Sequence, residues 1–505
     1  MSTGKVWLVG AGPSDVGLFT LKGKQVLEQA EVVVYDALVG HGVLSMVPKG
    51  VKLIDVGKRA GHHTMSQWKI NEVLLEEAQA GKRVVRLKGG DPFMFGRGGE
   101  ELELLAKNNI PYEVVPGVTS ALSVPAYNGI PVTHRDFCSS LHIITGHKRK
   151  GEKYDTDFEA LVRTKGTLVF LMGVTALGDI CEGLVNAGMD PNMPAAILQK
   201  GTSARQKRIV ATVSTLKAEV DRQGIETPAI IVIGKVCSLA DEFYWYEKLP
   251  LSGCRILVTR PRELASKMSD RLRKKGAEVV ELPAIRTQAI ENNEKLDKAF
   301  EDIKNYQWIA FTSQVGVKVF FDAMKDRKMD VRALSGAKIT AVGTATKKAL
   351  EERGIFADFI PSVYDGETLG KELTPLCNDG DKILIPRAKM GSGEIIKELS
   401  KIPNVQIDDV AIYDTLYEKS ELIDEAAEFA NGSIDYAVFT SASTVHGFAK
   451  AVEGMDFSNV EAICIGRQTA AAANEYGMKV HMSQKATIDS VIEKTEEVFT
   501  LKKQS

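Results

Sequence analysis

A glycine-rich turn after residues 84–87 carries the most specific arrangement of reactive side chains in this sequence. It contains five residues that could contact a ligand: Gly89, Gly90, Asp91, Met94 and Arg97. A β-branched run precedes the turn, and acidic residues at 100–101 open a predicted helix, where they suit the positive end of the helix dipole. This strand–glycine–helix order is typical of a ligand loop at the carboxyl end of a sheet. Because no Gly-Lys-Ser/Thr follows the glycines, the turn is not a phosphate loop.

Asp36 follows a run of apolar residues and is the strongest candidate for acid–base chemistry. A carboxylate at the carboxyl end of a strand, beside glycine-rich loops, is placed to abstract a proton. Capping of the next helix is an equally open alternative. A polar loop further along contains Lys58, whose charge suits an anionic substrate, and the adjacent His62 and His63. Adjacent histidines point to different faces, and no third ligand is spaced nearby, so we expect no metal site.

Small and polar residues recur at the ends of further predicted strands in the first half. The turns hold Pro13, Thr119, Ser120, Met172, Gly201 and Ala229, and a polar segment holds His134 and Arg135. Each turn could be ordinary loop chemistry, but together they would line one pocket. The turn at 10–15 invites a dinucleotide-binding interpretation. The fingerprint is incomplete, which disfavours that interpretation, because Asp15 occupies the third glycine position and Pro13 stands where the helix should start.

The second half contains an internal repeat, in which three strand-and-turn segments recur in one order at nearly constant separation. The matched pairs are 256–261 with 383–388, 308–313 with 435–441, and 339–346 with 462–469. Two similar α/β lobes facing each other would form a cleft lined by hydroxyl and backbone N–H groups. Helix N-termini hold anions, so such a cleft suits a ligand with many carboxylates. The hydroxyl residues of these turns could instead serve only as helix caps.

Strand-like and helical patterns alternate along the whole chain, which predicts α/β architecture. The clearest predicted strands are 6–9, 32–35, 84–87, 141–145, 168–172, 195–198 and 230–233. The alternation breaks at the aromatic segment 243–251, where we place a domain boundary near residue 250. A chain of 505 residues is long enough for several domains, on a prior of about 150 residues each.

Composition narrows the class of protein. The net charge is −2 and no basic run stands out, so a nucleic-acid partner is not indicated. No apolar stretch approaches the roughly 20 residues of a membrane span, and the first residues enter a predicted strand at once, so we expect no signal peptide. The six cysteines lie far apart, which argues against zinc and iron–sulfur sites and suggests reduced thiols. We therefore expect a cytoplasmic protein without a membrane partner.

The first half, about residues 4–245, resembles the tetrapyrrole methylases and, within them, uroporphyrinogen-III C-methyltransferase. The motifs that carry the resemblance are Gly10–Pro13, Lys88–Glu101, Gly129–Arg135, Leu171–Gly173 and Thr227–Ala229. One departure is the run after Pro13, where Ser14 stands in place of the family's usual glycine.

The region from about 253 to 500 resembles uroporphyrinogen-III synthase, a fold of two similar α/β lobes. The resemblance implies a two-lobed methylase at 1–248 and a synthase at 253–505, with one synthase lobe made of 253–286 plus 415–505 and the other of 290–410.

The resemblance to the methylases also implies roles for particular residues. S-adenosylmethionine would be the methyl donor, contacted by Pro13, Gly89, Gly90, Asp91, Met94, Thr119, Ser120, Met172, Gly201 and Ala229. Asp36 would accept a proton and Lys58 would donate one. Arg97, His134 and Arg135 would face the carboxylates of a tetrapyrrole substrate. Because this family is typically dimeric, we expect a homodimer formed through the methylase half.

In the synthase half, the resemblance implies that Ser313, Thr344, Ser441 and Thr469 line the cleft. Tyr413 would assist departure of a hydroxyl group, or would be only a packed aromatic whose hydroxyl is satisfied. The implied function is closure of hydroxymethylbilane to uroporphyrinogen III with inversion of the last ring, followed by two C-methylations to precorrin-2, which feeds siroheme and cobalamin.

Two alternatives remain open at this point. One is a methyltransferase with an inactive tetrapyrrole-binding C-terminal half, because no strong acid–base constellation follows residue 253. The other is a nicotinamide dehydrogenase fused to a periplasmic-type binding fold.

Overall fold

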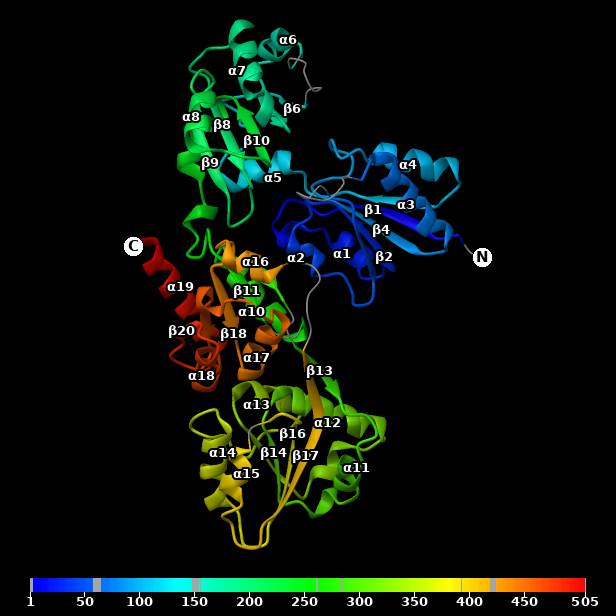
Figure 1. The fold of residues 1–505 in the computed structure, drawn as a ribbon, viewed down its shortest axis with the longest axis vertical. Coiled ribbons are helices and arrows are strands. Elements are labelled where there is room, and N and C mark those ends of the chain that lie inside the picture. Colours follow the sequence, from blue (N-terminus) through cyan, green and yellow to red (C-terminus); the bar gives the residue numbers. More distant parts are fainter. Residues whose placement is uncertain are drawn as a thin grey trace.

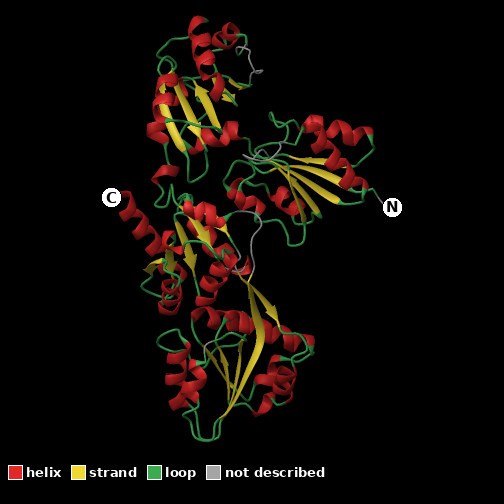
Figure 2. Ribbon diagram, viewed as in Figure 1, coloured by secondary structure: helices red, strands yellow, loops and turns green. Residues whose placement is uncertain are grey.

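The computed structural model describes residues 3–57, 65–147, 154, 156–259, 262–282, 285–391, 393–417 and 424–504. They form four α/β lobes, two in each half of the chain, arranged as an elongated molecule (Figure 1). We name the lobes A to D, in the order in which the chain enters them. Each is built on one five-stranded sheet, with helices packed against it (Figure 2). The predicted α/β architecture is confirmed.

Lobe A is a parallel sheet of strand order β3-β2-β4-β1-β5. Its elements are β1 (Lys5–Gly10), α1 (Leu21–Leu27), β2 (Val32–Tyr35), α2 (His41–Leu44), β3 (Lys52–Asp55), α3 (Gln67–Gln79), β4 (Arg83–Lys88), α4 (Gly98–Lys107) and β5 (Tyr112–Val115). Separate apolar clusters cover its two faces, one containing Val33 and the other Val34. All of β2 is buried, as expected for a parallel strand covered on both sides.

Lobe B is a mixed sheet of order β6-β7-β10-β8-β9, in which β6 and β7 are parallel and the remaining pairs are antiparallel. Its elements are α5 (Ser120–Tyr127), β6 (Leu141–Thr145), α6 (Phe158–Arg163), β7 (Thr167–Leu171), α7 (Leu177–Asn186), β8 (Pro194–Gln199), β9 (Lys207–Thr212), α8 (Leu216–Gln223), β10 (Ala229–Ile233) and α9 (Ala240–Phe243). The seven strands predicted in the first half correspond to β1, β2, β4, β6, β7, β8 and β10.

Lobe C is a parallel sheet of order β12-β11-β18-β19-β20. It combines β11 (Arg255–Val258), α10 (Arg262–Lys274) and β12 (Glu278–Glu281) with the last part of the chain. That part comprises α16 (Glu425–Ala430), β18 (Tyr436–Phe439), α17 (Ala442–Ala451), β19 (Glu461–Cys464), α18 (Arg467–Glu475), β20 (Lys479–Met482) and α19 (Ile488–Gln504).

Lobe D has the order β13-β17-β16-β14-β15, and β13 is its antiparallel edge strand. Its elements are β13 (Ile285–Ala289), α11 (Glu294–Glu301), β14 (Trp308–Phe311), α12 (Gln314–Asp326), β15 (Lys338–Ala341), α13 (Thr344–Glu351), α14 (Gly366–Leu373), β16 (Lys382–Ala388), α15 (Glu394–Leu399) and β17 (Gln406–Tyr417). Arg286 pairs with Leu416 across β13 and β17. The lobe boundaries expected at 286 and 415 therefore fall inside this strand pair, which belongs to lobe D.

The internal repeat occupies equivalent places in lobes C and D. Strands β11, β18 and β19 are neighbours in one sheet, and their repeat counterparts β16, β14 and β15 are neighbours in the same order in the other. Along the chain, however, the first copy of the repeat supplies β11, β14 and β15, and the second copy supplies the other three. Each lobe therefore combines strands from both copies.

Contacts join each lobe to the next, and α2 of lobe A also lies against β12 of lobe C. Between A and B, the Thr202 hydroxyl accepts hydrogen bonds from the amides of Ser14 and Asp15. Between B and C, the Arg205 guanidinium donates to the carbonyls of residues 432 and 433. Between C and D, Gln468 donates to a carboxylate oxygen of Glu394 at 3.2 Å. In the ranges given above, no helix combines the length and apolar character that a membrane span requires.

Candidate functional site

Three glycines pack backbone against backbone at the carboxyl edge of the lobe A sheet. Gly10 ends β1, while Gly90 and Gly117 follow β4 and β5. A Cβ on Gly10 would lie 2.5 Å from the Gly117 Cα, and a Cβ on Gly117 would lie 2.3 Å from the Gly90 carbonyl oxygen. The Gly90 amide also donates to the Gly12 carbonyl oxygen at 2.7 Å. Side chains would force these turns apart, so glycine is what lets the predicted ligand loops meet.

Asp91 organises the turn that follows. Its Oδ1 accepts hydrogen bonds from the amides of Phe93 (2.8 Å) and Met94 (3.1 Å), and its Oδ2 accepts one from the Gly117 amide (3.0 Å). The carboxylate thus holds the loop itself. Gly90 has a φ of +68°, and apart from Gly90 and its two chain neighbours no described atom lies within 4 Å of the position that a Cβ would take. The space beside Gly90 is therefore open to a ligand.

Lobe B contacts the turn after β1 through three hydrogen bonds. The Thr202 hydroxyl accepts from the amides of Ser14 (3.0 Å) and Asp15 (3.2 Å), and the Tyr127 hydroxyl donates to Asp15 Oδ2 at 2.7 Å. Burial, and then Asp15, raise the pKa of Tyr127, so its hydroxyl keeps its proton. Sequence reasoning gave neither Thr202 nor Tyr127 a role, and the signal for Thr202 was its place in a predicted strand-end turn, beside Gly201. A Cβ on Gly201 would lie 2.3 Å from a methyl of Val124.

The remaining residues predicted to contact the methyl donor lie in lobes A and B. Pro13 and Ala229 are buried, the latter at the start of β10. Thr119 caps α5 through the Ala121 amide, and Ser120 is the first residue of that helix. Met172 follows β7 with a φ of +57° and is half exposed. Met94 packs against the apolar cluster of lobe B that contains Val124 and Leu198.

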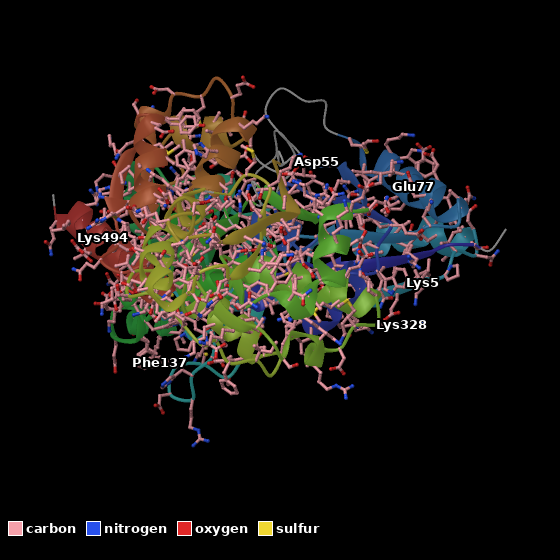
Figure 3. All side chains as sticks on the ribbon, turned by 90° about the horizontal axis from the view of Figure 1, so that it is seen from below. Lys5, Asp55, Glu77, Phe137, Lys328 and Lys494 are labelled. Carbon is pink, nitrogen blue, oxygen red and sulfur yellow. The ribbon has the colours of Figure 1, made fainter. Side chains whose placement is uncertain are left out.

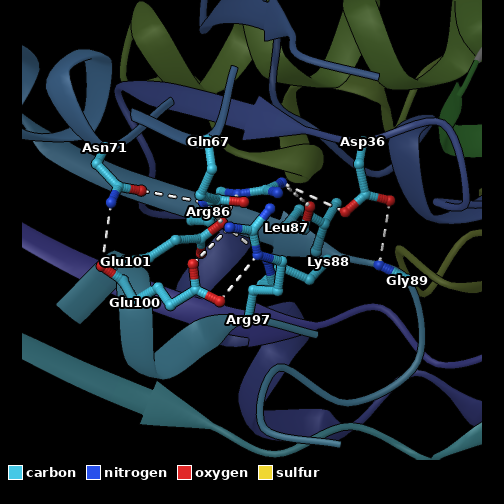
Figure 4. Close-up of polar contacts among 10 residues, drawn as sticks. All are labelled: Asp36, Gln67, Asn71, Arg86, Leu87, Lys88, Gly89, Arg97, Glu100 and Glu101. Carbon is cyan, nitrogen blue, oxygen red and sulfur yellow. Dashed lines mark hydrogen bonds and ion pairs between the residues drawn. The ribbon is translucent and has the colours of Figure 1, made fainter. Parts of the chain in front are cut away.

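Asp36 lies at the end of β2 and takes part in a network of charged groups (Figure 4). Its Oδ1 accepts from the Leu38 amide (3.1 Å) and, at a long 3.4 Å, from the Gly89 amide. Its Oδ2 lies 3.5 Å from Nη1 of Arg86. The α2 helix is capped by Gly40 instead, so Asp36 does not fill the alternative role of a helix cap. A quarter of its side chain stays exposed, which leaves it accessible to a substrate.

The residues predicted to bind the substrate differ in their surroundings. Arg97 has a left-handed backbone, and its exposed guanidinium pairs with Glu100 through two hydrogen bonds. His134 stacks on Phe137 with 4.7 Å between ring centroids, and Phe137 lies at the edge of the molecule in Figure 3. Arg135 is exposed. Lys58, the predicted proton donor, lies outside the described residues.

In the second half, the clearest polar contact between predicted residues joins Ser313 and Tyr413. Ser313 caps α12 through the Gly316 amide at 2.9 Å, and its Oγ lies 2.9 Å from the Tyr413 hydroxyl oxygen. Tyr413 is 6% exposed, and burial raises its pKa. Its hydroxyl is therefore neutral at physiological pH and able to donate a hydrogen bond.

The other predicted cleft residues differ in exposure. Ser441 caps α17 in a capping box with Thr444. Thr344 is the exposed first residue of α13. Thr469 is only 3% exposed, like its repeat counterpart Thr346, so its side chain faces the interior of lobe C. The residue that occupies Thr344's place in the other copy is Arg467, which is exposed.

Among the described side chains, no group of three or more His, Cys, Asp or Glu residues is arranged to hold a metal ion.

Two family models match the chain. Residues 5–217 match the tetrapyrrole (corrin/porphyrin) methylases, and residues 266–493 match uroporphyrinogen-III synthase HemD.

Whole proteins are similar as well. The chain is 47% identical over 498 residues to the porphyrin biosynthesis protein HemD of Ruminiclostridium josui, covering 99% of each. It is 41% identical over 362 residues to uroporphyrinogen-III C-methyltransferase of Bacillus subtilis, covering 71% of this chain and 74% of that one. A solved structure of uroporphyrin-III C-methyl transferase from Thermus thermophilus, complexed with S-adenosylhomocysteine, is 38% identical. The match covers 46% of this chain and 99% of that chain, with a TM-score of 0.40.

Proposed function

The chain belongs to the family of proteins that fuse a tetrapyrrole methylase to a uroporphyrinogen-III synthase, and from this membership we propose how its halves act in sequence. It is a bifunctional enzyme of tetrapyrrole biosynthesis. The C-terminal half closes hydroxymethylbilane to uroporphyrinogen III with inversion of the last ring. The N-terminal half then methylates two carbon atoms of that product, which gives precorrin-2.

The methyl donor of the N-terminal half is S-adenosylmethionine, which supplies an activated methyl group. The site fits it because glycine backbones meet there, open space lies beside Gly90, and a sulfonium needs enclosure more than a counter-charge. The residues that would hold it are those of the turns after β1, β4, β5 and β7, together with Gly201 and Ala229. Their contribution is to fix the geometry of transfer, a positioning effect that lowers the barrier by several kcal/mol, roughly 7–11 at its limit.

Asp36 acts as the proton acceptor in this scheme. A pyrrole ring carbon becomes nucleophilic as the ring N–H proton departs, and a partly exposed carboxylate at the strand end can take that proton. The contacts of Asp36 with Gly89 and Arg86 support the role, because they aim its oxygens at the same edge as the glycine turns. Lys58 would return a proton, while Arg97, His134 and Arg135 would contact substrate carboxylates.

In the C-terminal half, Tyr413 donates its hydroxyl proton toward the departing hydroxyl group of the bilane. The observation that supports this role is the 2.9 Å contact with Ser313, which places the hydroxyl at the carboxyl edge of lobe D, beside the N-terminus of α12. Helix N-termini such as those capped by Ser313 and Ser441 suit the substrate's carboxylates. Thr344 would complete the lining, whereas the buried Thr469 faces the interior of lobe C.

One observation supports the proposal most directly: the Asp36 carboxylate contacts the glycine turn after β4 through the Gly89 amide. The chain in which this contact occurs matches both family models. One coupled assay tests the proposal. The full chain receives hydroxymethylbilane and S-adenosylmethionine, and mass spectrometry follows the products. A doubly methylated type III product supports the proposal. If only type I uroporphyrinogen forms, the C-terminal half merely binds tetrapyrroles, which is the alternative function.

We also propose a homodimer formed through the methylase half and a cytoplasmic location. Both rest on the family resemblance and, for location, on six cysteines that are all free thiols. Light scattering would measure the molar mass of the full chain and of a chain that ends near residue 250, and both should have the mass of a dimer. A monomeric full chain would contradict it.

A further inference from the structure

Behind Asp36 lies a set of charged side chains that the proposed reaction does not use. Glu101 is completely buried, Arg86 is 3% exposed and Lys88 is 4% exposed. Glu101 Oε1 accepts from Arg86 Nε at 3.1 Å and from Lys88 Nζ at 2.7 Å. Together with Asp36, the group has two carboxylates and two cations and is balanced in charge (Figure 4).

The geometry of Arg86 makes it a connection between two carboxylates. Its Nε donates to Glu101, its Nη1 donates to the Leu87 carbonyl oxygen at 2.9 Å, and Nη1 also lies 3.5 Å from Asp36 Oδ2. A planar guanidinium held at two points has little freedom to turn. The side chain is thus fixed from the interior and presents one nitrogen to Asp36.

Burying this group is expensive, which argues for a purpose beyond stability. Each buried ion loses several kcal/mol of hydration, and buried pairs often gain no more than they lose. Burial lowers the pKa of Lys88, and Glu101 opposes that shift. Glu101 Oε2 is buried with no hydrogen-bond partner among the described atoms, so apolar side chains of similar size would cost less here.

Sequence reasoning assigned Glu101 only to the helix dipole, and it assigned no role to Arg86. We propose that Arg86 is a positioning residue for methylation: anchored by Glu101, it holds the Asp36 carboxylate in the orientation that accepts the substrate proton. The proposal rests on the proposed role of Asp36. Because Arg86 is buried, it acts through Asp36 and not by touching the substrate.

A double-mutant cycle on the full-length protein tests this. The variants are Arg86→Met, Asp36→Asn and the combination, assayed for methylation of uroporphyrinogen III and for S-adenosylhomocysteine affinity by calorimetry. A general base is worth about 10²- to 10⁴-fold, so we expect Arg86→Met alone to lower kcat by about 10- to 100-fold. The double variant should have the same kcat as Asp36→Asn alone, because Arg86 then has no carboxylate to position. Donor affinity should stay within about twofold of wild type in every variant.

Arg83→Met is the matched control. Arg83 lies on the same strand, but its side chain is exposed and bonds to the Gln29 carbonyl oxygen, so kcat should be unchanged. Two conservative variants cover the case in which Arg86→Met does not fold. Arg86→Lys keeps the cation and should recover part of kcat, while Glu101→Gln releases the anchor and should lower kcat without changing KM.

The outcomes separate the two levels of the proposal. If Asp36→Asn methylates normally, the proposed role of Asp36 fails and this inference fails with it. If Asp36→Asn is impaired while Arg86→Met is not, the inference alone is wrong. Equal losses from Arg86→Met in both backgrounds would show a merely structural effect and would also overturn it.

Discussion

The hydroxyl oxygens of Ser313 and Tyr413 lie 2.9 Å apart, although 100 residues separate them in the chain. Ser313 stands at the start of α12, and Tyr413 projects from β17. The contact forms because the carboxyl ends of β14 and β16 lie at the same edge of lobe D, and β17 passes this edge at Tyr413, which pairs with Ala388. A hydroxyl pair at the start of a helix can both donate to a leaving group and receive an anionic substrate.

Removing the Tyr413 hydroxyl tests whether it takes part in ring closure. We expect Tyr413→Phe to lower the synthase kcat by about 10- to 100-fold, as loss of a proton donor does, with little change in the urea midpoint. Tyr306→Phe is the control, because Tyr306 is a buried tyrosine of the same lobe whose hydroxyl donates to Asp408 at the opposite end of the strands. Equal synthase rates in both variants would make Tyr413 a packed aromatic only.

Removing the Asp36 carboxylate should separate catalysis from donor binding. In Asp36→Ala we expect methylation to fall by about 10²- to 10⁴-fold, measured as initial rate with saturating S-adenosylmethionine. Calorimetry should give an unchanged affinity for S-adenosylhomocysteine. Asp190→Ala, at an exposed turn of lobe B where Asp190 bonds the Asn192 amide, is the control. Near-normal turnover in Asp36→Ala would remove Asp36 from the mechanism.

The hydroxyl of Thr202 should support donor binding by holding the turn after β1. Thr202→Val leaves the amides of Ser14 and Asp15 without their protein acceptor, and the net loss for such a hydrogen bond is about 0.5–1.5 kcal/mol. We therefore expect weaker binding of S-adenosylhomocysteine, by about 2- to 12-fold. Thr212→Val makes the same chemical change at the end of β9, where the Thr212 hydroxyl contacts the Thr215 hydroxyl, and should leave the affinity unaltered. Wild-type affinity in Thr202→Val would contradict the role of this contact.

Glu113 makes part of the free energy of unfolding of lobe A depend on pH. Hydrogen bonds from Lys22 and Lys5 lower its pKa from 4.5 to about 2. As pH falls from about 4.5 toward about 2, the unfolded chain binds a proton before the folded chain does, so the free energy of unfolding decreases. Above that window the contribution is fully present.

Urea unfolding at a series of pH values measures this effect. Glu113→Gln should make the decrease between pH 4.5 and 2 shallower than in wild type. High salt should reduce the difference, because the carboxylate is near the surface and is screened. Glu103→Gln, on the exposed side of α4, is the control. Parallel curves for wild type and Glu113→Gln would show that the lysine contacts do not matter for folding.

Much of the fold could be predicted because its signals are local. Buried parallel strands read as apolar runs, so β2 and β4 were found within one residue of their ends. The glycine turns were found because a close backbone approach tolerates no other residue, as Gly10 and Gly117 show. The repeat was visible because its strands end in the same turn residues.

The parts that escaped prediction depend on partners far away in the chain. Thr202 has an ordinary sequence context, and its role appears only when lobe B lies against the turn at Ser14. Thr469 looked like a cleft residue, but its place in the first turn of α18 directs it inward.

The sequence by itself determined the alternation of strands and helices, the turns at the ends of the strands and the two families that the chain combines. The tertiary structure decided which turns meet, which lobe each strand of the repeat joins, and that the Glu101 side chain is buried against Arg86 and Lys88. The physical reason is the distance along the chain over which each interaction acts. Hydrophobic period and turn chemistry act over a few residues, whereas burial and charge pairing are set by whatever the folded chain brings within a few ångströms.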